Sequence, residues 1–157
     1  MSRKAYLLLF VGFAAPSAAA EYLTTVTSEV YQTTGSHSEI ARRGQSCIAQ
    51  NIHATDGQVI LVSDPDAGIV TAQNSFEYGA LPRWQLRSTL TLEAKDGRFR
   101  IVHTNIERFN DAALGGAGWY GVGKWWGSDW KRVEKELTDR ATLVAKCVMT
   151  PEKKDDW

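Results

Sequence analysis

Apolar and polar residues alternate along several segments of this chain, and the alternation predicts β-strands. The pattern is clearest in residues 84–95, where three leucines and Ser88 share one face and charged or polar residues occupy the other. Four other segments have the composition and length of strands: 22–32, 59–62, 69–78 and 98–107. The middle of the chain is therefore expected to form a sheet.

The strand after residue 95 is expected to follow a tight hairpin and to contain a β-bulge. Asp96 and Gly97 form a dipeptide that is typical of two-residue turns between antiparallel strands. Further along, Phe99 and Ile101 fall on one face of the strand, whereas Ile106 falls on the other. A bulge within residues 98–107 would explain the change of face.

Two segments repeat apolar residues at steps of three and four, which predicts α-helices. The first covers residues 36–51 and begins with Ser36 and Glu39 at the spacing of a capping box. Gly44 lies in its middle, where glycine is unfavourable, and a close approach to the sheet would explain it. The second helix begins near Asp129 and carries an apolar stripe: Trp130, Val133, Leu137, Ala141, Val144 and Val148.

The predicted order of elements, β-α-β-β-β-β-α, specifies an α+β fold with a single antiparallel sheet and both helices packed on one face. No internal repeat or linker divides the chain, so residues 21–150 are expected to form one domain. Residues 151–157 are expected to be a charged flexible tail. Residues 110–128 are rich in glycine and aromatic residues and are expected to form a loop.

Residues 1–20 have the three parts of a secretory signal peptide. Arg3 and Lys4 form a charged start, residues 5–15 are apolar, and residues 18–20 are an alanine triplet suited to cleavage. The apolar run is shorter than the roughly 20 residues of a membrane-spanning helix, although a retained anchor is the alternative. We expect cleavage after Ala20, a periplasmic or secreted protein, and no stable membrane anchor afterwards.

The cysteine pattern agrees with an oxidising compartment. Cys47 and Cys147 are the two cysteines of the chain, and in an exported protein such a pair predicts a disulfide. Two separate buried thiols are the alternative. The three histidines, His37, His53 and His103, are scattered without the spacing of metal ligands, so no metal site is expected.

Two nucleotide-binding patterns occur in the glycine-rich segment, but both lack the context that the chemistry needs. Residues 116–121 match G-x-G-x-x-G, yet the predicted helix begins several residues later. Residues 118–124 match G-x-x-x-x-G-K, but Trp125 replaces the hydroxyl residue that would hold magnesium. We therefore expect no nucleotide and no other cofactor.

Residues that could suggest catalysis or ion binding have simpler explanations. The chain contains no G-x-S-x-G motif. Asp64 and Asp66 flank Pro65 and are expected to form a β-turn rather than a calcium site. His103 lies in a predicted strand and is expected to pack rather than to act as a base. The sequence thus gives no catalytic residue, and a non-enzymatic role is expected.

Four aromatic residues of the glycine-rich segment form the candidate binding surface: Trp119, Tyr120, Trp125 and Trp126. Aromatic side chains are enriched at recognition surfaces, and the surrounding glycines permit a loop to change shape. The alternative is that these rings fold back to cover the core, as Trp130 is expected to do from the helix stripe.

Several local motifs resemble a known family. They are the helix at 40–52, the sequence Val-Ser-Asp-Pro-Asp-Ala-Gly-Ile-Val at 62–70, the strand after Lys95-Asp96-Gly97, and a closing helix. Over residues 38–148 the chain resembles a bacterial exported domain of unknown function with a TATA-binding-protein-like fold. The resemblance implies a fold and no activity. The cysteine pair and the tryptophans have no counterpart in that family and inherit no role from it.

Charge separates this chain from the DNA-binding proteins after which that fold is named. Without Arg3 and Lys4 the chain has sixteen basic and eighteen acidic residues, a net charge of −2. Bulk charge therefore gives no attraction to nucleic acid or anionic lipid.

Together these features predict a non-enzymatic binding or structural module of the cell envelope, with an envelope protein or a glycan as its partner. A small envelope enzyme or an enzyme inhibitor is the alternative. Shifted carboxylates or histidines in a cleft would favour an enzyme, and an exposed aromatic surface would favour a binding module.

Overall fold

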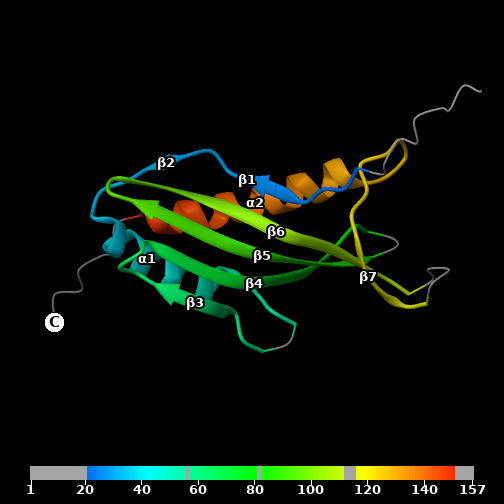
Figure 1. Ribbon diagram of the computed structural model, residues 1–157, viewed down its shortest axis with the longest axis horizontal. Coiled ribbons are helices and arrows are strands. Elements are labelled where there is room, and N and C mark those ends of the chain that lie inside the picture. The colour runs from blue at the N-terminus through cyan, green and yellow to red at the C-terminus, as the bar shows by residue number, and fades with distance from the viewer. Residues whose placement is uncertain (1–20, 56, 81–82, 112–115, 151–157) are drawn as a thin grey trace, which may run out of the picture.

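One face of an antiparallel sheet packs against two helices in this protein (Figure 1). The computed structural model describes residues 21–55, 57–80, 83–111 and 116–150. The predicted signal peptide and the predicted C-terminal tail lie outside the described residues. The architecture confirms the α+β fold class that the sequence predicts.

Seven strands make up the sheet in the described part of the chain. They are β1 (Thr25–Thr27), β2 (Tyr31–Gln32), β3 (Ile60–Asp64), β4 (Ile69–Tyr78), β5 (Trp84–Lys95), β6 (Arg98–Asn110) and β7 (Gly118–Gly121). The order across the sheet is β1-β6-β5-β4-β3, and both β2 and β7 also pair with β6. Every pair is antiparallel. Strand β6 therefore connects four other strands.

Residues 22–32 form two short strands rather than the single strand that their composition predicts. Ser28 causes the interruption, because its Oγ accepts a hydrogen bond from the Ile101 N–H at 2.9 Å and its own N–H donates to the Ile101 carbonyl. The hydroxyl takes the place of a backbone acceptor, and the chain leaves the ladder until Tyr31 pairs with Phe99.

The predicted bulge is confirmed, and Asn105 causes it. Between Arg87 and Thr89 of β5, the pairing partners on β6 change from Glu107 to Thr104, so β6 contains one extra residue. Asn105 has a φ of +50°, in the left-handed region that asparagine tolerates better than most residues. The bulge moves Ile106 onto the buried face, and Phe99, Ile101 and Ile106 are all buried.

Helix α1 (His37–Asn51) has the predicted capping box at its start. The Ser36 N–H donates to Glu39 Oε2 at 2.8 Å, and the Glu39 N–H donates to Ser36 Oγ at 3.4 Å. Gly44 faces the sheet at close range, since a methyl group added there would lie 2.6 Å from Leu92 Cδ1. The close approach that the sequence suggested for this glycine is therefore present.

Helix α2 (Trp130–Met149) runs along the sheet and is covalently joined to α1. Cys47 and Cys147 form a disulfide, with their Cα atoms 5.8 Å apart. Arg43 of α1 adds a second link, because its guanidinium donates to the Val148 carbonyl at 3.2 Å. No helix in the described part of the chain is long and apolar enough to span a membrane.

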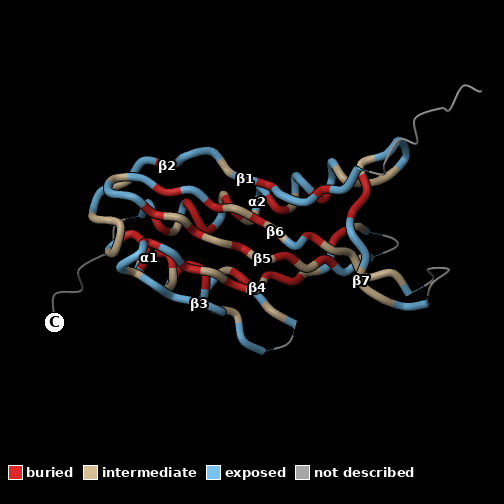
Figure 2. Tube along the Cα trace, viewed as in Figure 1, coloured by how far each residue is buried: buried red, intermediate tan, exposed pale blue. Residues whose placement is uncertain are grey.

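The core consists of two apolar clusters on the helix-facing side of the sheet. Buried and less buried residues alternate along β4, β5 and β6, so only one face of the sheet is packed (Figure 2). The first cluster lies between the sheet, α1 and the C-terminal half of α2: it includes Ile40, Ile48, Leu90, Leu92 and Val144. The second lies under the N-terminal half of α2: it includes Leu23, Leu86, Ile106, Val133 and Leu137.

The disulfide should be a large contributor to stability, because it closes a loop of 100 residues. The chain-entropy model gives at most about 4.7 kcal/mol for a loop of this length. We expect Cys47→Ala combined with Cys147→Ala to lower the free energy of unfolding by several kcal/mol in urea titrations. Added reductant should lower the stability of the wild type but not of the double variant. Equal stability of the two oxidised proteins would contradict this prediction.

Gly44→Ala should destabilise the protein although alanine favours helices. Alanine would gain about 1 kcal/mol of helix propensity. The new methyl group would overlap Leu92, which is fully buried, and such overpacking costs about 1–3 kcal/mol. We expect a net loss of about 1 kcal/mol in thermal or urea unfolding. Ser46→Ala on the exposed side of the same helix is the control and should be neutral or slightly stabilising.

Candidate functional site

The candidate site is the connection between β7 and α2, residues 122–129, which we name the aromatic loop. Backbone hydrogen bonds attach it to the first described residues of the chain. The Leu23 N–H donates to the Val122 carbonyl at 2.7 Å, and the Lys124 N–H donates to the Glu21 carbonyl at 2.7 Å. Tyr22 and Gly123 form an isolated antiparallel bridge. The loop therefore has a defined backbone at one end of the sheet (Figure 1).

The hydroxyl of Ser128 closes the loop from within. Ser128 Oγ lies 2.6 Å from the Gly123 carbonyl and 2.9 Å from the Trp125 carbonyl, within hydrogen-bonding distance of both. The Ser128 N–H also donates to the Trp125 carbonyl at 3.2 Å. These bonds fold residues 123–128 into a compact turn that orients the two tryptophans.

Trp125 and Trp126 lie on the outside of this turn. Trp126 is 99% exposed and Trp125 is 53% exposed. The Trp125 ring packs over Gly123, where a methyl group would overlap it at 1.5 Å. Its edge contacts the ring of Tyr22, with centroids 6.2 Å apart. Tyr22, itself 47% exposed, completes a group that we name the exposed ring cluster: Tyr22, Trp125 and Trp126.

The structure separates Trp119 from this cluster. Trp119 pairs with Phe109 across β7 and β6, on the face of the sheet that the helices leave open, and the two ring centroids are 5.4 Å apart. The Arg87 guanidinium lies 4.4 Å from the Trp119 ring centroid and forms an ion pair with Glu107 at 2.7 Å. Trp119 thus packs on the end of the sheet, which is the covering role that the sequence left open as an alternative.

Tyr120 is also separate from the cluster. Consecutive residues of a strand point to opposite faces, so Tyr120 lies on the other side of β7 from Trp119. Its hydroxyl donates to the Gly116 carbonyl at 2.8 Å, and the side chain is 41% exposed. The four predicted residues therefore do not form a single surface, although Trp125 and Trp126 are both exposed on the same turn.

Tyr22 was absent from the sequence-based surface because it lies about a hundred residues from the tryptophans and within a predicted strand. Its large aromatic side chain next to the predicted cleavage site was the available signal. The pairing of Tyr22 with Gly123 is a long-range contact, and no local pattern encodes it.

The start of α2 is fixed by a polar network, which in turn fixes the end of the aromatic loop. Asp129 accepts a hydrogen bond from the Tyr78 hydroxyl at 2.7 Å and forms an ion pair with Arg108 at 2.8 Å. Burial and the Asp129 carboxylate raise the pKa of Tyr78, so its hydroxyl stays protonated and remains a donor. The Arg108 guanidinium also lies 4.6 Å from the Trp84 ring centroid.

A buried polar triad, Asn74, Ser88 and His103, lies between the two apolar clusters. It contains a serine next to a histidine, a pair of residues that some enzymes use in catalysis. Asn74 Nδ2 donates to Ser88 Oγ at 3.1 Å, and Ser88 Oγ lies 3.1 Å from His103 Nδ1. Ser88 can therefore donate to Nδ1, which places the proton of the neutral ring on Nε2. Asn74 Oδ1 and His103 Nε2 make no hydrogen bond within the described residues.

His103 does not form an active site with Ser88. Burial, and to a lesser extent the charge of Arg140, lower the pKa of His103 to about 4, although the Leu137 backbone acts in the opposite direction. The imidazole is neutral at neutral pH and could accept a proton from Ser88 in principle. However, His103 is 0% exposed, so a substrate in solution cannot reach the ring. The histidine is packed, as the sequence predicted.

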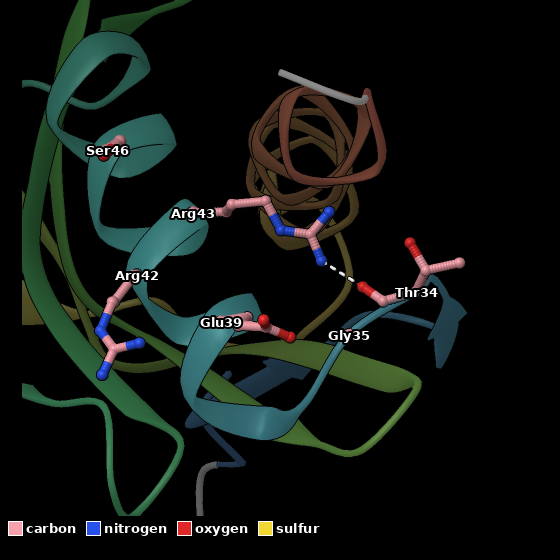
Figure 3. A pocket seen from close by; sticks show the side chains of 6 residues that line it. All are labelled: Thr34, Gly35, Glu39, Arg42, Arg43 and Ser46. Carbon is pink, nitrogen blue, oxygen red and sulfur yellow. Dashed lines mark hydrogen bonds between the residues drawn. The ribbon is translucent and has the colours of Figure 1, made fainter. Parts of the chain in front are cut away.

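A hollow of about 440 Å³ beside α1 is lined by polar side chains that the fold itself uses (Figure 3). Arg43 donates to the carbonyls of Thr34 and Val148. Hydrogen bonds from Ser36 lower the pKa of Glu39, which belongs to the capping box. Glu39 and Arg43 therefore tie α1 to the preceding chain, and Arg43 also ties it to α2.

The acidic turn and the histidine near it also have structural roles. Asp64 Oδ1 accepts from the Ala67 N–H at 3.0 Å and closes the turn at 64–68. His37 Nδ1 lies 2.8 Å from Asp96 Oδ1, and His37 Nε2 lies 3.1 Å from the Asp66 carbonyl. The hydrogen bond with Asp96 raises the pKa of His37. Among the described residues, no group of three His, Cys, Asp or Glu side chains could hold a metal ion.

The glycine patterns belong to a strand rather than to a phosphate-binding loop. Residues 118–121 form β7, and α2 begins nine residues after that strand ends. A backbone already paired with β6 does not offer the free N–H groups that a phosphate needs.

Buried His103 predicts a loss of stability in mild acid. The ordinary pKa of 6.5 applies to the unfolded chain, whereas the folded value is about 4. Between these values the unfolded state binds more protons, so stability is full above pH 6.5 and falls as pH drops toward 4, by about 3 kcal/mol at most. Urea titrations across this range should show the loss.

His103→Leu is the control, and the difference between the two proteins isolates this histidine from the carboxylates that titrate in the same range. We expect the variant to have a flatter profile between pH 4 and 6.5. His37 acts in the opposite direction in both proteins, because its raised pKa stabilises the fold at low pH and this contribution is lost as pH rises. Parallel profiles of wild type and variant would show that His103 titrates normally in the folded state.

Comparison with known proteins identifies the fold. Neither a family model nor a curated protein matches the sequence. A DUF4468 family protein from Bacteroides ovatus superposes with a TM-score of 0.58 at 14% identity, covering 83% of this chain and 88% of that one. A TBP-like protein from Parabacteroides distasonis gives a TM-score of 0.57 at 12% identity, covering 82% and 94%. The fold is therefore that of TBP-like bacterial domains, as the sequence resemblance implied.

Proposed function

We propose that this chain is an exported, non-enzymatic binding module of the bacterial cell envelope, and that it binds through the exposed ring cluster. The observation that carries the proposal is Trp126, which is 99% exposed on a loop whose backbone is well bonded. Exposed apolar patches usually mark interaction sites. A ring held outward by a defined loop loses little freedom when a partner covers it.

Two further observations support export and a binding role. The disulfide between Cys47 and Cys147 suits an oxidising compartment. The pKa of His103 is strongly lowered, but the side chain is buried rather than set in a cleft. The shifted pKa therefore does not favour the enzyme alternative. An envelope protein or a glycan remains the kind of partner that the sequence suggests.

The test replaces Trp125 and Trp126 together by alanine. Because Trp126 is almost fully exposed and Trp125 is half-exposed, the free energy of unfolding should change by no more than about 1 kcal/mol. Binding to a native envelope fraction, which contains protein, glycan and lipid, should fall to background. Stability is measured by urea titration and binding by retention on the immobilised chain.

Val30→Ala combined with Leu143→Ala is the matched control, since these residues are 53% and 48% exposed and lie outside the aromatic loop. This control should retain full binding. Unfolding of the tryptophan double variant would show that the rings belong to the core. Unchanged binding by that variant would place the function elsewhere on the molecule.

A further inference from the structure

The chemistry around the exposed ring cluster indicates which kind of partner it meets. We propose that the aromatic loop docks on the surface of a lipid bilayer, with Trp125 and Trp126 inserted at the level of the headgroups. This inference rests on the proposed function, because it assigns a partner to the same ring cluster. It describes reversible association rather than a membrane-spanning anchor.

The residue types of the cluster are those that prefer a membrane interface. Tryptophan and tyrosine combine an apolar ring with one polar group, and they are enriched where lipid headgroups meet the hydrocarbon. Trp126, Trp125 and Tyr22 are exposed by 99%, 53% and 47%. The aromatic loop that carries the two tryptophans lies at one end of the sheet, next to the start of α2 (Figure 1).

Basic side chains lie around Trp130, the residue that begins α2 directly after the aromatic loop. The ammonium groups of Lys124 and Lys131 lie 5.7 Å and 5.6 Å from the centroid of the Trp130 ring, one coming from the loop and one from the first turn of α2. Within the described ranges, neither Lys131 nor Arg132 forms an ion pair with a carboxylate. Lys131 and Arg132 can therefore bind the phosphates of lipid headgroups.

The polar groups of the loop argue against a glycan as the partner. Carboxylates and carboxamides are the side chains that pair with sugar hydroxyls beside aromatic rings. The carboxylate of the aromatic loop, Asp129, is engaged by Tyr78 and Arg108. The neighbouring Glu21 carboxylate pairs with Lys124. Ser128, the hydroxyl residue of the segment, is occupied by the carbonyls of Gly123 and Trp125. What the cluster offers to a partner is therefore mainly two indole rings, with the exposed Tyr22 ring beside them.

The first described residue of the chain is held at this loop. Glu21 is held at the loop by its carbonyl, which accepts from the Lys124 N–H, and by its carboxylate, which lies 3.2 Å from the Lys124 ammonium. The predicted cleavage site after residue 20 therefore directly precedes, in the sequence, a residue that is held at the loop.

The net charge of −2 that the chain has without Arg3 and Lys4 decides which force dominates. A chain with this charge gains nothing from bulk attraction to anionic lipid. Insertion of the rings must therefore supply most of the affinity, and Lys131 and Arg132 a smaller share. Binding should persist in neutral vesicles and become moderately tighter with anionic lipid.

The experiment measures flotation of the chain, as recovered after export, with phosphatidylcholine vesicles and with mixed vesicles that also contain phosphatidylglycerol. Lipids brominated in the acyl chain should quench part of the tryptophan fluorescence of the wild type. We expect Trp125→Ala combined with Trp126→Ala to weaken partitioning about tenfold or more and to remove the quenching.

Two control variants separate the contributions. Lys131→Gln combined with Arg132→Gln should weaken binding to the anionic vesicles a few-fold, so that the preference for anionic lipid disappears. Binding of this variant to neutral vesicles should be unchanged. The Val30→Ala and Leu143→Ala double variant should behave like the wild type. Absence of wild-type binding to both vesicle types, or equal binding by the tryptophan variant, would overturn the membrane proposal.

Failure of the membrane proposal can be distinguished from failure of the proposed function. An envelope fraction extracted free of lipid provides the comparison. One outcome is that the wild type fails to bind vesicles but binds this lipid-free fraction, with the binding lost in the tryptophan variant. In that case the partner is a protein or a glycan, and the membrane proposal is wrong. The tryptophan variant can also be compared with the wild type on vesicles, on the native envelope fraction and on the lipid-free fraction. If the two proteins bind all three equally, the proposed function fails as well.

Discussion

Strand β6 is the constraint on which the rest of this structure depends. Its thirteen residues pair with β5 along one edge and with β1, β2 and β7 in turn along the other. Two- to four-residue strands are not stable alone, so these three require the edge that β6 offers. The bulge at Asn105 then lets the two halves of one strand bury Phe99, Ile101 and Ile106 on the same side.

The buried polar triad divides the core and connects its two halves. Asn74, Ser88 and His103 come from β4, β5 and β6 and lie between the clusters that α1 and the start of α2 cover. A partly satisfied buried network is costly in a core. It is held here because three paired strands fix the register of its members, and the neutral state of His103 avoids the greater cost of a buried charge.

The two ends of the sheet perform different tasks. At one end the disulfide and Arg43 join α1 to α2 and restrict the unfolded chain. At the other end α1 is absent, and glycine backbone, Ser128 and the bridge from Tyr22 hold a loop with its rings outward. The fold is similar to TBP-like domains at 12–14% identity, and such likeness carries no activity. The binding proposal therefore rests on this loop.

Local sequence determined the elements whose signals are local. The composition of residues 69–78, the alternation of residues 84–95, the Ser36 capping box and the helix stripe after Asp129 were sufficient, because these signals are encoded by neighbouring side chains. Tertiary structure alone decided that residues 22–32 divide at Ser28, that glycine-rich residues 118–121 form a strand, and that Tyr22 joins Trp125. These outcomes depend on hydrogen bonds to the edge of β6 and on contacts about a hundred residues apart, which no short pattern in the sequence records.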